Sequence, residues 1–359
     1  MRILVDATSL LLRSAGIKSY TWHWIESLRR VAPSGAIGVF PFLGGAAGSL
    51  DHEHSILPPA ATWARLGGVF LTNLIGSPAL DAACRGYDTF HASNMIRVPP
   101  RRARLTATIH DLTCRLMPEL HASGNIRADQ YFANHILRRA DGLIAVSEST
   151  KQDAVRLLGL DARRITVIHS GVDERFYTAK PLVRERPYVL FLGTVEPRKN
   201  LDTLIEAWKM LPESEYELLV AGPAGWKSEA TVARLSRADR VRYLGYVPEA
   251  EIPALTAGAA VFAYVSLYEG FGFPVAQAMA AGVPVVTSNT SSLPEVAGEG
   301  ALLVDPRSPV EIAAALERLL SSAELRATVG SAGRARAQRY RWEDCARRSI
   351  EFFEKVAGR

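Results

Sequence analysis

The chain has 359 residues, 48% of them apolar and 22% charged, which is enough for two domains that each bury a core. The formal charge of +5 suits an anionic ligand but is too small to indicate a nucleic-acid-binding protein. Three widely spaced cysteines, Cys84, Cys114 and Cys345, favour a reduced cytoplasmic protein over a disulfide framework. No signal peptide precedes the first expected strand, and no apolar run reaches the ~20 residues of a membrane span.

The first half of the chain alternates short apolar runs with helical patterns. Expected strands are 2–5, 37–42, a segment ending at 91, 104–109, 142–146 and 165–168. Expected helices are 17–33, 128–139 and 147–158, with a variable excursion containing one helix at 44–80. This alternation predicts a parallel, doubly wound sheet covered by helices on both faces.

Polar residues follow two of these strands. His110 and Asp111 come after the strand 104–109, and Ser93 and Asn94 come after the segment ending at His91. Ligands of doubly wound sheets bind at the carboxyl ends of strands. We therefore expect His110 to hydrogen-bond to a ligand, the alternative being a structural histidine.

The second half repeats the pattern after a junction at 169–173 and an irregular connection to 186. Expected strands are 188–192, 217–221, 241–244, 261–265, 284–287 and 301–304. Expected helices are 200–210, 228–235, 249–257, one opening at 274, 310–321, 323–338 and a terminal helix at 342–356 with an apolar face. The sequence thus predicts a second Rossmann-like unit.

Two loops of this half have the chemistry of an anion site. After the strand 188–192, Arg198 and Lys199 can neutralise phosphate. The alternative is a basic turn exposed to solvent, which would have the same sequence pattern. In the stretch 268–286, Gly270 and Gly272 allow close approach of a ligand, and a helix begins at about Pro274. A helix start that faces a ligand binds anions, whereas the alternative is an ordinary loop before a buried helix.

Taken together, these motifs resemble the family-4 group of retaining, nucleotide-sugar-dependent glycosyltransferases of the GT-B fold. The similarity is densest in five segments: 167–173, 193–200, 244–247, 269–286 and 292–296. It implies two Rossmann-like domains facing a cleft. They are an acceptor-binding domain at 1–170 and a nucleotide-sugar-binding domain at 171–340, with a helix at 341–359 that packs on the first.

The resemblance also implies roles for individual residues. Arg198 and Lys199 would bind the diphosphate, Glu269 the donor-sugar hydroxyls, and His110 the sugar near the bond that breaks. The remaining implied donor contacts are Gly16, Gly193, Thr194, Tyr246, Val247, Gly270, Phe271, Gly272, Phe273 and Gln277.

Three positions depart from the family pattern. Gln277 stands where the family commonly has an acidic residue that holds the ribose, and a neutral amide would bind it more weakly by ~1 kcal/mol. Thr194 stands where many members have an arginine, so Arg198 is expected to supply that charge. The usual double glycine of the first half is replaced by Ala15-Gly16.

We therefore predict an enzyme that moves a hexose from a nucleoside diphosphate sugar to a glycan, lipid-linked or small-molecule hydroxyl. No Asp-x-Asp pair occurs, which favours a metal-independent reaction with no cofactor. The Pro-Arg-Lys-Asn form at 197–200 resembles mannosyltransferases of polysaccharide biosynthesis. The alternatives are a sugar-nucleotide epimerase or hydrolase, and a catalytically silent nucleotide-sugar-binding subunit, which Gln277 would suit.

A peripheral contact with the inner face of a membrane is a further alternative. Two regions suggest it, namely Arg101, Arg102 and Arg104, and the helix that bears Trp22, Trp24, Arg29 and Arg30. A solvated basic surface would give the same pattern.

Overall fold

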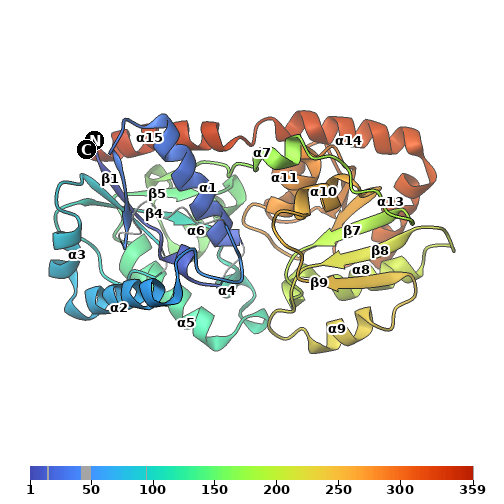
Figure 1. The fold of residues 1–359 in the computed structure, drawn as a ribbon, viewed down its shortest axis with the longest axis horizontal. Helices are drawn as coiled ribbons and strands as arrows, with labels where there is room; N and C mark the ends of the chain where they lie inside the picture. Colours follow the sequence, from blue (N-terminus) through green and yellow to red (C-terminus); the bar gives the residue numbers. More distant parts are fainter. Residues whose placement is uncertain (14–15, 42–49, 94, 359) are drawn as a thin grey trace. The chain divides into compact units, whose positions relative to one another are not determined.

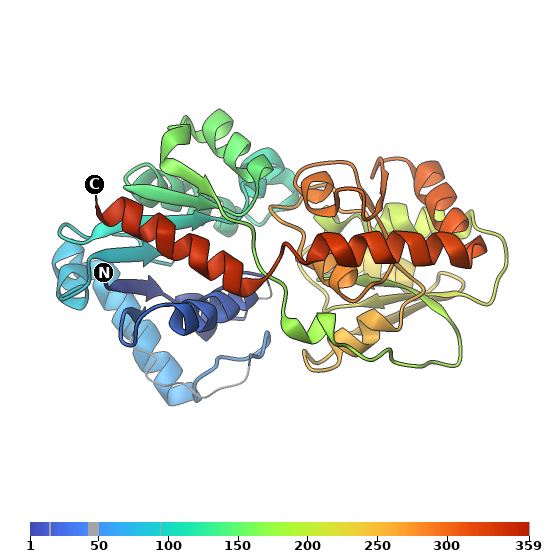
Figure 2. The same ribbon diagram turned by 90° about the horizontal axis from the view of Figure 1, so that it is seen from above.

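The computed structural model describes residues 1–13, 16–41, 50–93 and 95–358. It divides into two compact units (Figures 1 and 2). Unit 1 comprises Met1–Gly171 and Trp342–Arg359, and unit 2 comprises Val172–Arg341. The chain therefore leaves unit 1 once and returns to it for the terminal helix.

Unit 1 is built on a parallel six-stranded sheet in the order β2-β1-β3-β4-β5-β6. Its strands are β1 (Ile3–Asp6), β2 (Ile37–Phe40), β3 (Thr89–Ala92), β4 (Arg104–Ile109), β5 (Gly142–Ala145) and β6 (Ile165–Val167). Its helices are α1 (Gly16–Val31), α2 (Pro59–Ile75), α3 (Ser77–Ala83), α4 (Thr113–Leu116), α5 (Ser123–Phe132), α6 (Glu148–Leu158) and α15 (Trp342–Ala357). Most strand residues are buried, which is the expected pattern for parallel strands covered on both faces.

Unit 2 holds a second parallel six-stranded sheet in the order β12-β11-β10-β7-β8-β9. Its strands are β7 (Tyr188–Leu192), β8 (Glu217–Ala221), β9 (Val241–Gly245), β10 (Val261–Tyr264), β11 (Val285–Ser288) and β12 (Leu302–Val304). Its helices are α7 (Glu174–Tyr177), α8 (Leu201–Lys209), α9 (Glu229–Leu235), α10 (Ile252–Ala257), α11 (Phe273–Ala280), α12 (Leu293–Ala297), α13 (Pro309–Ser321) and α14 (Ala323–Ala337). The predicted α/β fold class with two doubly wound sheets is confirmed.

Several helices differ from the sequence-based expectations. Where one helix was expected in the excursion, the structure has α2 and α3, divided at Gly76. The helix α5 begins at Ser123 rather than at 128. Three helices of four or five residues, α4, α7 and α12, were not expected, because such short helices carry too little periodicity to detect.

The terminal helix α15 packs against α1 within unit 1, as Figure 2 shows. Trp24 is only 1% exposed, and its indole N–H donates a hydrogen bond to Ser349 Oγ at 3.0 Å. The ring of Trp24 also lies 6.0 Å from that of Phe353. Trp24, one of the four residues of this helix that suggested a membrane contact, is therefore part of the core and cannot make that contact.

Gly171 lies directly against the first residue of α15. A Cβ atom at this position would overlap the backbone nitrogen and the indole of Trp342. We expect Gly171→Ala to lower the free energy of unfolding by about 1–3 kcal/mol, the usual cost of overpacking. Chemical denaturation would measure this.

Gly67→Ala is the matched control. A Cβ at Gly67 meets no described atom within 4 Å, and alanine favours a helix interior by about 0.5–1 kcal/mol. Equal stabilities of the Gly171→Ala and Gly67→Ala proteins would contradict the close packing of α15 on this turn.

Candidate functional site

The strand order of unit 2 reverses between β7 and β10, which are neighbours in the sheet but far apart in the chain. Ligands of open α/β sheets bind at the carboxyl ends of the strands at such a reversal. The loop after β7 contains Arg198 and Lys199, and the loop after β10 contains Glu269. The topology therefore brings together the two loops that sequence motifs had marked separately.

Three adjacent strands of this sheet end at a glycine. Gly193 follows β7, Gly222 follows β8, and Gly245 ends β9. A Cβ at Gly222 would overlap the carbonyl of Gly193, and Gly222 has a φ of 137°. The amide of Val195 donates to the carbonyl of Pro223 at 2.9 Å, which ties the first two loops together.

Because a glycine has no side chain, a phosphate group can closely approach the backbone at these three positions. Sequence reasoning missed Gly222. The repeated strand-then-glycine pattern, read over β7, β8 and β9, was the signal that could have found it.

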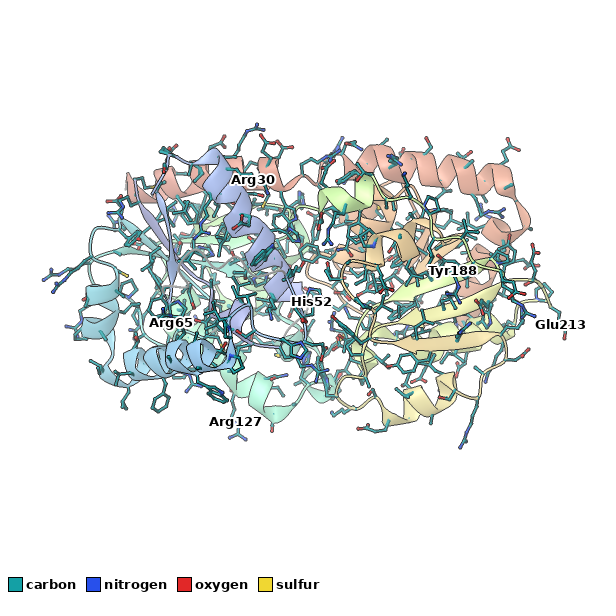
Figure 3. All side chains as sticks on the ribbon, in the orientation of Figure 1. Arg30, His52, Arg65, Arg127, Tyr188 and Glu213 are labelled. Carbon is teal, nitrogen blue, oxygen red and sulfur yellow. The ribbon has the colours of Figure 1, made fainter. Side chains whose placement is uncertain are left out.

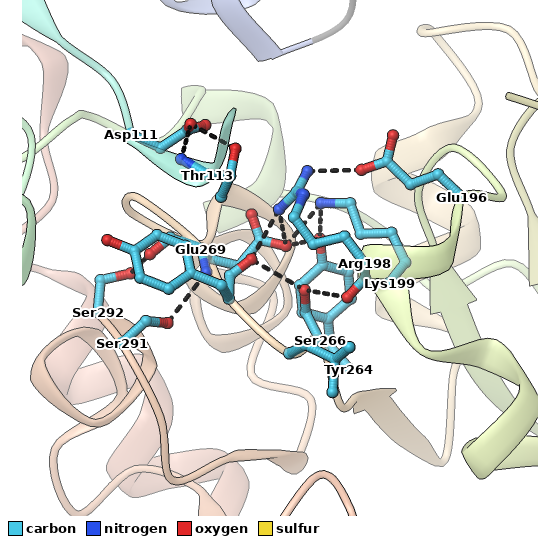
Figure 4. Close-up of polar contacts among 12 residues, drawn as sticks. Asp111, Thr113, Glu196, Arg198, Lys199, Tyr264, Ser266, Glu269, Ser291 and Ser292 are labelled. Atoms are coloured by element: carbon cyan, nitrogen blue, oxygen red, sulfur yellow. Dashed lines mark hydrogen bonds and ion pairs between the residues drawn. The ribbon is translucent and has the colours of Figure 1, made fainter. Parts of the chain in front are cut away.

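A buried ionic cluster lies at the reversal point (Figure 4). Lys199 Nζ donates to Glu269 Oε1 at 2.6 Å and to the hydroxyl of Tyr264 at 2.5 Å. The same Glu269 oxygen lies 2.9 Å from Arg198 Nη1 and accepts a bond of 2.9 Å from the Tyr264 hydroxyl. Tyr264 was not predicted, because a tyrosine in a buried strand has no distinguishing sequence signal.

Arg198 has a second carboxylate partner. Its Nη2 donates to Glu196 Oε1 at 2.6 Å, and its Nη1 donates to the carbonyl of Tyr268 at 2.7 Å. The two cations of the loop are therefore balanced by two carboxylates, Glu196 and Glu269. The sequence suggested the basic pair but not that its charge is already compensated within the protein.

The cluster changes the protonation of its members. Burial alone would raise the pKa of Glu269, yet Arg198 and Lys199 bring it down to about 2. Desolvation and the adjacent Arg198 lower the pKa of Lys199, while Glu269 opposes that shift. Glu269 is thus an ionised carboxylate at any physiological pH, and its proton affinity is too low for it to act as a general base.

Hydrogen bonds to backbone fix both loops. Asn200, in the left-handed conformation with φ of 59°, ends the turn Pro197–Lys199, and its side-chain amide donates to the carbonyls of Val265 and Pro306 at 3.0 and 2.7 Å. Ser291 Oγ accepts from the Glu269 amide at 3.0 Å, and Ser292 Oγ donates to the Glu269 carbonyl at 2.9 Å. Glu269 is therefore held by its backbone as well as by its side chain.

The helix α11 follows this loop and begins at Phe273 after Gly272, which has φ of 95°. The N-terminal end of a helix carries partial positive charge, which is the property that the anion site predicted from the sequence depends on. Gln277 lies on α11 and is partly exposed. Tyr246 and Val247 lie in the loop after β9, where Tyr246 is 42% exposed.

In unit 1, His110 follows β4 and is partly exposed. Its ring meets that of Tyr20 edge-on at 4.8 Å. Desolvation lowers the pKa of His110 to about 4, so the imidazole is neutral at pH 7 and can both donate and accept a hydrogen bond. Asp111 accepts bonds from the amide and hydroxyl of Thr113 at 3.0 and 2.7 Å, which gives it a structural role at the start of α4.

Ser93 and Gly16 are two further residues of unit 1 that the sequence analysis named. Ser93 follows β3 and its hydroxyl donates to Asp6, at the end of the neighbouring β1. Gly16 is the first residue of α1. Ser14, Ala15 and Asn94 lie outside the described residues.

Among the residues that the structure describes, no group of three His, Cys, Asp or Glu side chains could hold a metal ion. In the same part of the chain, no helix has the length and apolar character needed to cross a membrane.

Comparison with known proteins places the chain in a family. Residues 173–336 match the family described as Glycosyl transferases group 1, and residues 39–176 match Glycosyltransferase Family 4. The O-antigen chain mannosyltransferase B of Escherichia coli is 33% identical over 281 residues, which cover 74% of each chain. The serotype-specific mannosyltransferase WbdA of Escherichia coli is 26% identical over 268 residues. These residues cover 69% of the present chain but only 33% of WbdA, which is longer.

A solved structure has the same fold. HepE of Anabaena, crystallised in complex with UDP-glucose, superposes with a TM-score of 0.72 at 22% identity, covering 99% of this chain and 100% of that one. The chain is therefore a glycosyltransferase of the GT-B fold. It belongs to the group 1 and family 4 glycosyltransferases, as its motifs indicated.

The low pKa of Glu269 makes a prediction about stability. A carboxylate whose pKa falls on folding stabilises the protein above its unfolded pKa, and this contribution is lost as pH falls through the folded pKa. We expect Glu269→Gln to lower the free energy of unfolding at pH 7 by about 2–4 kcal/mol, since it leaves two buried cations with one carboxylate. Wild-type stability should fall between about pH 4.5 and 2 more steeply than that of the variant.

Denaturant titrations at several pH values would measure both effects. Glu206→Gln is the control, because Glu206 is 52% exposed in its pair with Arg234 and should contribute less than about 1 kcal/mol. Identical pH profiles for wild type and Glu269→Gln would show that the cluster does not stabilise unit 2.

Proposed function

We propose that the protein transfers mannose, with retention of configuration and without a metal ion, from a nucleoside diphosphate mannose to a hydroxyl of a glycan. The observation that carries this proposal is the 33% identity with an O-antigen chain mannosyltransferase over 74% of both chains. The Arg198–Glu269–Lys199 cluster supports it, because it lies where unit 2 is expected to hold the donor.

In this proposal the diphosphate is the leaving group. Arg198, Lys199 and the N-terminal end of α11 stabilise the negative charge that develops on it, which is the main source of catalysis in such transfers. The donor phosphate then shares these two cations with Glu269 and Glu196, the carboxylates that balance them in the structure. Glu269 also orients the donor sugar through hydrogen bonds to its hydroxyls.

Retention is proposed to occur by attack of the acceptor hydroxyl on the face of the sugar that the diphosphate leaves. The bond from the sugar to the diphosphate breaks, the bond to the acceptor oxygen forms, and the leaving diphosphate takes the acceptor proton. Glu269 is a poor covalent nucleophile, because three donors engage one of its oxygens and its pKa is about 2. Neutral His110 is proposed to hydrogen-bond to the sugar.

The first experiment is a donor panel. The purified protein is incubated with GDP-, UDP-, ADP- and dTDP-sugars, with a mannose-terminated oligosaccharide as acceptor, with and without EDTA. We expect GDP-mannose to be consumed, the α-configuration of its sugar to persist in the product by NMR, and EDTA to have no effect. An altered free sugar nucleotide would indicate an epimerase, and binding without turnover would indicate a silent subunit.

Lys199→Ala tests the site within this experiment. Loss of a charged group that stabilises the leaving group should lower kcat by about 100- to 1,000-fold. Lys209→Ala is the matched control, because Lys209 lies exposed at the end of α8, the helix that follows Lys199. Unchanged turnover in Lys199→Ala would show that Lys199 does not stabilise the leaving diphosphate and would refute this donor site.

Gln277 is expected to limit donor affinity. Gln277→Glu would restore an ionised acceptor for the ribose hydroxyls, and charge-assisted bonds are stronger than neutral ones by about 1 kcal/mol. We expect the nucleoside diphosphate to bind about fivefold more tightly by isothermal titration calorimetry. Gln338→Glu, at the end of α14, controls for the added charge, and an unchanged Kd would show that Gln277 does not contact the ribose.

A further inference from the structure

The helix α2 has its large apolar side chains on the outside. Trp63 is 74% exposed, Phe70 70% and Leu74 71%, and the spacing of seven and four residues aligns them on one face of the helix. Leu71 and Ile75, both more than half exposed, widen this face. We call these five residues the apolar face of α2.

The opposite side of α2 contacts the rest of unit 1 through smaller residues. Thr62, Val69 and Thr72 are its buried residues. This is the reverse of an ordinary surface helix, which buries its large apolar residues and exposes polar ones. Exposed apolar faces of this kind mark interaction surfaces, because scattered single residues are normal but contiguous ones are costly in water.

The surroundings of this face are basic. Residues 59–104 contain six arginines against two aspartates and have no lysine or glutamate. One of the arginines, Arg65, lies on α2 itself, and Figure 3 shows it among the side chains of that helix. Most of the net charge of +5 is therefore concentrated in this segment.

Hydrogen bonds attach an arginine-rich segment to α2 and α3. Asn73 of α2 donates to the carbonyl of Met95 at 3.1 Å and accepts from the amide of Arg97 at 2.9 Å. Ser77, two residues after the end of α2, donates to the carbonyl of Pro99 at 2.8 Å. The segment 95–101 therefore runs beside the apolar face rather than elsewhere on unit 1.

This segment leads into a pocket of about 320 Å³ in unit 1. The pocket is lined by four arginines together with Pro99, Pro100 and Asp141, and the arginines are Arg101, Arg102, Arg104 and Arg139. Arg104 pairs with Asp141 at 3.1 Å, so one carboxylate faces four guanidinium groups. Guanidinium groups bind phosphate with two parallel hydrogen bonds.

We propose that the apolar face of α2 and this arginine pocket together dock unit 1 on an anionic phospholipid surface. The helix lies in the plane of the interface with Trp63, Phe70 and Leu74 among the acyl chains, and the arginines bind headgroup phosphates. A lipid surface fits better than a protein partner, because it offers both kinds of contact at one interface. Its acyl chains receive the apolar side chains of α2, and its negative phosphates bind the arginines beside them.

Vesicle flotation with the full chain tests this proposal. The protein is mixed with vesicles of phosphatidylcholine alone or with 30% phosphatidylglycerol, and the floated fraction is measured at low and at physiological salt. We expect binding to the anionic vesicles, at least about tenfold weaker binding to the neutral ones, and weakening by salt. Equal binding to both vesicles, or no binding to either, would overturn the proposal.

Two double variants separate the apolar and the charged contributions. Phe70→Gln with Leu74→Gln should weaken binding by at least about tenfold, since each buried apolar side chain contributes about that factor. Arg101→Gln with Arg102→Gln should weaken it by about fivefold per arginine and reduce its dependence on phosphatidylglycerol. All four side chains are exposed, so folding should persist, and circular dichroism melting would verify it.

Val183→Gln with Met210→Gln is the matched control, because these exposed apolar residues lie in unit 2, far from α2 in sequence. The control should bind vesicles like the wild type. Sedimentation velocity without lipid tests the alternative that a second copy of the chain covers α2. The lipid proposal would be overturned in favour of self-association by two results together. The wild type would form a dimer that Phe70→Gln with Leu74→Gln abolishes, and vesicle binding would be unchanged in that variant.

Discussion

The convergence of Arg198, Lys199 and the Tyr264 hydroxyl on one oxygen of Glu269 is the interaction on which the candidate site depends. It joins the loops after β7 and β10, the two strands between which the sheet order of unit 2 reverses. Burying four charges is costly, and the cluster is tolerable because each cation has a carboxylate at 2.6 to 2.9 Å. A donor diphosphate would therefore enter a site whose cations are already placed and oriented.

The glycines beside this cluster determine what can approach it. Gly193, Gly222 and Gly245 leave the edge of β7, β8 and β9 without side chains, and Gly222 packs so closely on Gly193 that no Cβ fits. The charged side chains thus lie in the loops after β7 and β10, whereas the glycines after β7, β8 and β9 offer only backbone groups. This arrangement suits a nucleotide sugar, because cations neutralise its phosphates and glycines let protein backbone groups approach them.

Unit 1 combines two kinds of apolar surface that look alike in the sequence. The apolar residues of α1 and α15 cover one another, and the Trp24 indole finds its partner in Ser349. The apolar residues of α2 have no such cover among the described residues, and they adjoin a segment rich in arginine. The first surface stabilises the fold, whereas the second is available to bind an anionic lipid surface.

Strand-helix alternation and glycine-bounded loops are local patterns, so the amino-acid sequence was enough to predict the fold class, most of the strands and the loops that carry Arg198, Lys199 and Glu269. It could not show that these three residues meet, since 70 positions separate Lys199 from Glu269 and only the sheet order closes that distance. It also missed Tyr264 and Gly222, whose roles come from neighbours in other segments, and Glu196, whose partner Arg198 lies two residues away in the same loop. Periodicity reveals that a helix has an apolar face, but only packing in three dimensions shows that the face of α1 with Trp24 is buried by α15 and that the face of α2 with Trp63 is exposed.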